Sequence, residues 1–430
     1  MKNNNKDIYS LSKILFPLHR SLMGKDNLKT LEIIKSIIPS MKIKFFRSGK
    51  KSFDWTVPKE WNLEEAYIAD MQGNKIINVT NNNLHVVQYS ISVDKVLSFR
   101  ELKDNLYFIK SSPNAIPYIT SYYKKNWGFC ISHNEKKKLK KGIYEVFIDS
   151  KFTIGNLNYG ELIIKGKSKK EIFLSTNICH PSMGNNELSG MCVTTYLAKW
   201  IRNLKKTNYT YRIIFIPETI GAIAYLFYNL KSMKKNIIAG FNVVCIGDNY
   251  NYSYVPSRYG DTYSDLVAKH ILKNTYPKFK TFSWLQRGGD ERQYCAPKIN
   301  LPVVSIMRSK YETYEEYHTS LDNLNFISSK GLEGGFNVLM NSLICIENNF
   351  IPIATNYCEP QLSKRGLYWD VVLEKNKNNN VKLLVNFLSL SDGKNSILDI
   401  ANICQIPIWE LYKISEKLLK NKLIRIKKLH

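Results

Sequence analysis

The chain is 430 residues long, 44% of them hydrophobic, and it carries a formal charge of +26. This length and apolar content predict a substantial core and more than one domain, and apolar runs such as residues 223–228 are too short to cross a bilayer. Because residues 1–7 are polar, we expect no signal peptide and a cytoplasmic protein.

The positive charge is spread along the chain rather than gathered in one arginine-rich stripe. Lysine, asparagine and isoleucine are used heavily throughout, as an AT-rich genome would produce. Lysine-rich runs at residues 136–141 and 420–428 keep a polyanionic partner open as an alternative. We therefore expect nucleic acid to be the less favoured partner, and we expect no membrane partner.

The first 130 residues divide into a helical and a β-rich part. Within residues 1–45, apolar side chains recur at helical spacing over positions 28–38. From residue 46 to residue 130, apolar and polar residues alternate between Asn and Gly turns, which predicts a small sheet domain. Its aromatic residues suit either core packing or a substrate cleft; they are Trp55, Trp61, Tyr118, Tyr122, Tyr123 and Trp127.

Four later apolar runs are each followed by a residue that can bind a metal or transfer a proton. The runs at residues 171–176, 211–216, 241–246 and 301–307 precede His180, Glu218, Asp248 and His318, in that order. Because ligands gather at the carboxyl ends of strands in α/β sheets, we expect these side chains to share one site. Imidazole and carboxylate are the ligands that zinc prefers in open catalytic sites.

Each of these residues also has an ordinary structural interpretation. His180 precedes a proline in a turn, Asp248 can begin an Asx turn, and Glu218 can cap a following helix. The eight cysteines form no CxxC pair and are best interpreted as buried thiols. Since neighbouring strand residues point to opposite faces, we expect that Cys179 is not a ligand.

Short motifs along nearly the whole chain carry a family resemblance. They lie at residues 15–21, 54–61, 83–90, 116–118, 127–130, 177–190, 217–221, 289–294, 316–320 and 358–361. Together they resemble the zinc aminopeptidase-like proteins of bacterial surface-polysaccharide clusters. The resemblance implies an α/β fold with a mixed sheet flanked by helices in residues 1–45 and 131–365. It also implies an inserted β-rich lid or specificity domain at 46–130 and a winged helix-turn-helix domain at 376–430.

The resemblance further implies roles at the site. His180, Asp248 and His318 would bind the metal. Glu218 would act as the general base, taking a proton from metal-bound water and passing it to the leaving amine.

Three neighbouring residues are implied in substrate binding. Asp290 would orient the substrate or support the site. Glu291 and Arg292 would hold the substrate's amino or carboxylate end, because a guanidinium binds a carboxylate through two hydrogen bonds.

Two positions depart from the family pattern. Asn186 stands where the family has an aspartate that bridges two cations, and an amide offers one good ligand oxygen and no charge. The adjacent Glu187 is an alternative ligand if the loop shifts. Thr219 replaces a second carboxylate directly after the general base. We therefore expect one zinc ion at most, with an empty site as the alternative.

The C-terminal region has the rhythm of a winged helix. A polar linker at residues 375–380 precedes an apolar helix at 381–390, and further helical patterns cover 396–401 and 408–414. The last of these carries few base-reading groups and no arginine. We therefore expect it to dock a protein or a second copy of the chain rather than DNA.

The leading function is metal-dependent hydrolysis of an amide in a peptide or an amidated sugar precursor. One alternative is a catalytically lapsed binding or scaffold protein of surface-polysaccharide biosynthesis, and another is a DNA-binding regulator. No GxSxG motif occurs, so hydrolysis by a serine nucleophile is not expected.

Overall fold

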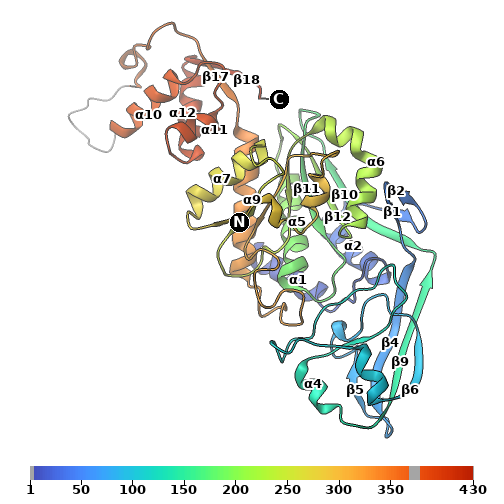
Figure 1. Cartoon of the computed structure of the whole chain (residues 1–430). Coiled ribbons are helices and arrows are strands. Elements are labelled where there is room, and N and C mark those ends of the chain that lie inside the picture. Colours follow the sequence, from blue (N-terminus) through green and yellow to red (C-terminus); the bar gives the residue numbers. More distant parts are fainter. Residues whose placement is uncertain (1–3, 368–377, 430) are drawn as a thin grey trace. The chain divides into compact units, whose positions relative to one another are not determined.

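The computed structural model describes residues 4–367 and 378–429, which form two compact units (Figure 1). Unit 1 comprises Met1–Ser264 and Lys280–Asn337, and unit 2 comprises Asp265–Phe279 and Val338–His430. Within the described ranges, no helix combines the length and the apolar character that crossing a membrane requires.

Unit 1 is built on an eight-stranded mixed sheet. In spatial order its strands are β1 (Lys42–Arg47), β10 (Asn156–Ile164), β12 (Thr210–Ile216), β11 (Glu171–Asn177), β13 (Ile237–Asn242), β16 (Val303–Met307), β14 (Ser253–Val255) and β15 (Lys280–Thr281). Strands β12, β11, β13 and β16 run parallel to one another. Every residue of β11 and β12 is buried, as expected for parallel strands covered on both faces. This sheet confirms the predicted α/β class.

The helices of unit 1 alternate with strands along much of the chain. They are α1 (Asn4–Leu15), α2 (Lys25–Ile37), α3 (Phe99–Leu102), α4 (His133–Lys138), α5 (Ser189–Arg202), α6 (Ile220–Asn236) and α8 (Glu291–Tyr294). Helices α7 (Tyr263–Thr275) and α9 (Ser329–Asn348) begin in unit 1 and end in unit 2.

A second sheet forms the inserted domain. Its order is β5 (Lys75–Asn78), β4 (Glu60–Asp70), β9 (Ile143–Thr153) and β6 (Val93–Ser98), and Figure 1 shows β4, β9 and β6 running together, apart from the large sheet. Two short pairs accompany it: β2 (Lys51–Ser52) with β3 (Trp55–Thr56), and β7 (Leu106–Tyr107) with β8 (Phe129–Cys130). Because β9 pairs with both β4 and β6, the inserted domain extends past the predicted boundary at residue 130.

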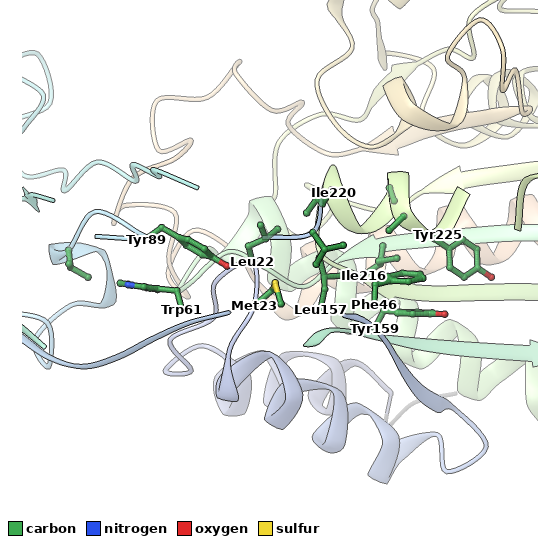
Figure 2. Packing of buried hydrophobic residues seen from close by; sticks show 14 of the residues in the cluster. Leu22, Met23, Phe46, Trp61, Tyr89, Leu157, Tyr159, Ile216, Ile220 and Tyr225 are labelled. Atoms are coloured by element: carbon green, nitrogen blue, oxygen red, sulfur yellow. The ribbon is translucent and has the colours of Figure 1, made fainter. Parts of the chain in front are cut away.

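One hydrophobic cluster joins the inserted domain to the large sheet. Figure 2 follows it from Trp61 and Tyr89 in the inserted domain, past Leu22 and Met23, to Leu157 of β10. The rings of Trp61 and Tyr89 stack with centroids 5.7 Å apart, and both side chains are almost fully buried. A shared core of this kind holds the inserted domain firmly against the main sheet.

Unit 2 contains the winged helix. Its elements are α10 (Asn378–Ser389), α11 (Ile397–Ile403), α12 (Ile408–Lys420) and the antiparallel pair β17 (Ile351–Ala354) and β18 (Ile424–Lys427). Ser396 caps α11 in a capping box with Asp399. Since β17 precedes residue 376, this fold begins earlier than predicted. The predicted linker at 375–380 lies partly outside the described residues.

Candidate active site

The register of β11 and β12 brings two of the predicted site residues together. Asn177, the last residue of β11, lies beside Ile216, the last residue of β12, and the Ile178 amide donates to the Ile216 carbonyl. The loops that carry His180 and Glu218 therefore leave the sheet side by side. Nε2 of His180 lies 3.7 Å from Oε2 of Glu218.

His180 is held in place by Glu187. The Nδ1 atom of His180 is 2.5 Å from Oε2 of Glu187, and the His180 amide donates to Oε1 of the same carboxylate at 2.7 Å. Glu187 lies in a π-helical turn, Gly184–Leu188, and is completely buried. A carboxylate on one ring nitrogen fixes the tautomer and orientation of an imidazole. Nε2 of His180 is therefore the ring nitrogen left for a ligand.

The charge of Glu187 has a buried partner. Nε of Arg20 donates to the His180 carbonyl at 3.1 Å and lies 3.9 Å from Oε1 of Glu187. Burial lowers the pKa of His180, but the negative charges of Glu187 and Glu218 outweigh burial and raise it. The carboxylate of Glu187 is thus paired with both Arg20 and His180 inside the protein.

His318 lies close to His180, although it comes from a later loop of the chain. Its ring centroid lies 5.3 Å from that of His180 and 5.2 Å from that of Tyr118. Its backbone has a φ of +53°, which is unusual for a residue with a side chain. Burial lowers the pKa of His318 to about 3, so its imidazole is neutral, as a metal ligand must be.

Glu218 is followed by a strained residue. Thr219 has φ +62° and ψ −82°, the conformation of a rare γ-turn. Its amide donates to Oδ1 of Asp290 at 2.8 Å, and Nη2 of Arg292 donates to its hydroxyl at 2.8 Å. Strained backbone of this kind persists where surrounding contacts impose it, commonly at functional sites.

Two carboxylates beside this turn have raised pKa values. Burial raises the pKa of Glu218, while His180 and Arg292 pull it down. Burial raises the pKa of Asp290 well above its ordinary value, and Oδ2 of this buried side chain has no hydrogen-bond partner among the described residues. Asp290 therefore supports the turn through Oδ1, which accepts from the Thr219 amide.

Asp248 is engaged by its own chain. Its Oδ2 accepts from the Asn185 amide group and from the Ser309 backbone, each at 2.9 Å, and its Oδ1 accepts from the Tyr250 backbone at 2.7 Å. The bond to Tyr250 is the Asx turn that the sequence offered as an alternative. Since the side chain is completely buried, Asp248 acts here as a structural anchor of its loop.

Asn186 faces a second buried cluster. The backbone N–H of Asn186 donates to Oδ2 of Asp322 at 2.9 Å. The side-chain Oδ1 of Asn186 lies 3.7 Å from Sγ of Cys245, a residue whose backbone φ is +51°. The backbone N–H of Asn185 and the Tyr314 hydroxyl also donate to Asp322. Burial raises the pKa of Asp322 to about 7.

Glu291, which the sequence predicts to hold one end of the substrate, makes internal hydrogen bonds. It is completely buried, and its carboxylate accepts from the amides of Gly288 and Gly289, the Tyr311 hydroxyl and the Asn242 side chain. These bonds use the carboxylate to order the loop before α8. Its neighbour Arg292, in contrast, lines the pocket.

The remaining site residues surround one pocket of about 410 Å³, which we call the inner pocket. Its polar wall is formed by His180, Glu218, Arg292 and His318. Its aromatic wall comes from the inserted domain and consists of Trp55, Tyr118, Tyr122 and Tyr123. This volume is sufficient for a small organic ligand.

Among the described residues, one group of at least three His, Cys, Asp or Glu side chains has its ligand atoms within 4.8 Å of one another: Cys179, His180 and Glu187. Cys179 lies after the end of β11, so strand alternation does not turn it away, and its Sγ is 3.4 Å from Nδ1 of His180. Burial raises the thiol pKa well above its ordinary value, which opposes metal binding.

Three possible metal donors line the inner pocket, although their ligand atoms do not gather as closely as those of Cys179, His180 and Glu187. His180 offers Nε2, His318 offers a neutral imidazole, and Glu218 is a carboxylate beside them. Asn186 and Thr219 supply no charge for a second cation, and Asp248 is already hydrogen-bonded. Sequence reasoning did not find the supporting contacts of Arg20, although the motif at residues 15–21 contains it.

Comparison with known proteins identifies the family of the chain. Residues 9–349 match a family described as a domain of unknown function, DUF4910, and residues 351–426 match a winged helix-turn-helix family. The chain belongs to the DUF4910 family. A Clostridium acetobutylicum member, named as a candidate polysaccharide biosynthesis protein with an aminopeptidase-like domain, is 42% identical over 396 residues. That match covers 92% of this chain and 90% of that protein.

Solved structures place this DUF4910 protein in the aminopeptidase-like fold. A candidate peptidase from Clostridium acetobutylicum superposes with a TM-score of 0.93 at 39% identity, covering 99% of this chain and 98% of that one. The zinc aminopeptidase BSAP from Bacillus subtilis gives a TM-score of 0.57 at 13% identity, covering 80% and 94%. The second likeness shows the fold alone. The predicted family resemblance is confirmed.

Proposed function

We propose that this protein is a one-zinc amide hydrolase in which Glu218 moves the proton. The observation that carries the proposal is the bond between Glu187 and Nδ1 of His180, which leaves Nε2 of His180 facing Glu218 at 3.7 Å in the inner pocket. A ring nitrogen oriented by a carboxylate on its opposite side is characteristic of metal-binding histidines.

His180 and His318 would hold the metal, with Glu218 beside it. A bound zinc ion supplies a Lewis acid that polarises a carbonyl and lowers the pKa of water. Asp248 is left out of this ligand set because its oxygens already accept three hydrogen bonds. Asn186 is left out because an amide is a weak, uncharged ligand.

Glu218 would take a proton from the attacking water and deliver it to the leaving nitrogen. A general base works best when its pKa lies near the working pH, and burial raises the pKa of Glu218 in that direction. The strained Thr219 turn, tied to Asp290 and Arg292, fixes the carboxylate relative to His180. Arg292 would bind a negatively charged end of the substrate.

The substrate would be a peptide or an acylated amino sugar. The name of the Clostridium acetobutylicum relative, which refers to polysaccharide biosynthesis, favours the sugar. None of the eight cysteines, all of which lie in the described residues, forms a disulfide, which suits the reducing cytoplasm that we expect for this protein.

The winged helix would dock a protein partner. The exposed residues of α12 include Trp409, Glu410 and Lys413, and this helix has no arginine. Arginine, the side chain that most often reads guanine, is therefore missing from it. Binding of DNA by this unit is the alternative.

A second candidate function is ligand binding without turnover. The uncharged Asn186 and the hydrogen-bonded Asp248 favour it, because both reduce the number of ligands available to a metal. In this case the inner pocket would hold an amide-bearing ligand for other biosynthetic proteins.

Replacement of Glu218 by Gln separates the two candidates. We expect Glu218→Gln to retain bound zinc and to lower kcat by about 10²- to 10⁴-fold on aminoacyl p-nitroanilides or N-acyl hexosamines, whichever the native protein cleaves. The exposed Glu315→Gln is the matched control and keeps full activity. Zinc-loaded native protein without turnover, or an unimpaired Glu218→Gln variant, would contradict the hydrolase.

A further inference from the structure

A second pocket adjoins the inner pocket. This outer pocket has a volume of about 400 Å³ and shares two wall residues, Tyr122 and Tyr123, with the inner one. Its other walls include Tyr89 and Phe152 from the inserted domain. Tyr122 and Tyr123 therefore border both pockets, and we call the two pockets together the cleft.

The aromatic walls of this cleft hold one another in position. Tyr123 donates its hydroxyl to the Thr56 carbonyl at 2.9 Å, and its ring meets Trp55 edge-on at 6.1 Å. The ring of Tyr89 meets two other rings edge-on, with its centroid 5.0 Å from that of Tyr122 and 5.9 Å from that of Phe152. Prearranged rings need little additional ordering when a ligand binds.

Three of these rings remain accessible at the rim. Trp55 is 38% exposed, Tyr123 is 59% exposed and Phe152 is 37% exposed. Exposed aromatic faces beside a pocket suit a ring that has an apolar C–H face and polar hydroxyl edges. A sugar ring has this character.

The outer pocket is also strongly basic. Lys59, Lys124 and Lys125 line it, all three are exposed, and no acidic residue belongs to its lining. None of these lysines belongs to an ion pair within the described residues. The charge complements an anionic ligand rather than a neutral one.

We propose that the outer pocket is a subsite for the anionic sugar portion of the substrate, with the acyl-nitrogen bond lying in the inner pocket. The anionic group is a phosphate or a carboxylate on the sugar. The inference rests on the proposed function for the direction of the cleft, but binding in the outer pocket requires no hydrolysis. A peptide with an acidic side chain would satisfy the lysines and leave the exposed rings unused.

Calorimetric titration of the zinc-free Glu218→Gln protein with N-acetylglucosamine 1-phosphate and with glucuronic acid tests the proposal. We expect at least one of the two to bind, and which one binds distinguishes phosphate from carboxylate. Lys124→Gln with Lys125→Gln would weaken binding about 5- to 10-fold, and added salt would weaken it further. Tyr123→Ala would weaken it by a similar factor through lost stacking.

The pair Lys137→Gln and Lys138→Gln is the matched control, because both lysines are exposed and lie outside the pocket lining. We expect this control to bind as the parent does. Equal weakening in the control, equally tight binding of neutral N-acetylglucosamine, or binding of an acetylated aspartyl peptide in place of both sugars would overturn the proposal. If the native protein hydrolyses no substrate, the proposed function fails, but binding of an anionic sugar in the outer pocket would still support this proposal.

Discussion

The loops of His180 and Asp248 follow neighbouring strands of the same sheet, yet their polar side chains differ in where their hydrogen bonds go. In the His180 loop, Glu187 binds one ring nitrogen and leaves the other facing the inner pocket. In the Asp248 loop, Asn185, Ser309 and Tyr250 occupy both carboxylate oxygens. The same position in the fold therefore presents a ring nitrogen to the inner pocket in one loop and orders the loop itself in the other.

The difference shows that a polar residue at a strand end is defined by its hydrogen-bond partners. A buried side chain whose oxygens accept hydrogen bonds from its own loop contributes to stability. A side chain that presents a nitrogen or oxygen to a pocket is available for chemistry. Each side of this comparison can be tested by removing its central contact.

Asp248→Ala tests the structural side and has the largest expected effect on stability. The change leaves the donors of Asn185, Ser309 and Tyr250 without their acceptor, so we expect the free energy of unfolding to fall by about 3 kcal/mol. Urea denaturation of the zinc-free protein measures it. The exposed Asp261→Ala is the control, with an expected change below about 0.5 kcal/mol. Loss of zinc from correctly folded Asp248→Ala would identify Asp248 as a ligand and contradict the comparison.

Glu187→Gln tests the ligand-binding side. The side chain keeps its shape but loses the charge that fixes the His180 ring, so we expect zinc affinity to fall about 10- to 100-fold. Competition with a chromogenic chelator measures the dissociation constant, and circular dichroism verifies folding because Arg20 loses its partner. The exposed Glu315→Gln, outside the lining of the inner pocket, is the control. Unchanged affinity would show that Glu187 does not orient His180.

Much of the fold was accessible from the sequence because buried parallel strands are continuous apolar runs. The runs at residues 171–176 and 211–216 correspond to β11 and β12. The end of the inserted domain was placed too early, because β9 follows a lysine-rich helix and pairs with strands far back in the chain. Such long-range pairing leaves no local signal.

The site was only partly accessible from the sequence, for a related reason. Strand ends predicted which edge of the sheet carries His180, Glu218 and Asp248, but not which acceptors were already used. Burial of Glu291 and the position of Cys179 beside Nδ1 of His180 depend on loop conformation outside regular strands. The aromatic and lysine walls of the outer pocket come from separate segments that only the folded inserted domain brings together.

The central claim is that His180 belongs to a single-zinc site, and metal content tests it most directly. Plasma mass spectrometry of the purified, tag-free protein would give zinc per chain for the native protein and for His180→Ala, with Asn186→Asp as a second variant. We predict one zinc per native chain and its loss in His180→Ala. A native protein that takes up no zinc while Asn186→Asp does would contradict the claim and make ligand binding without turnover the function to pursue.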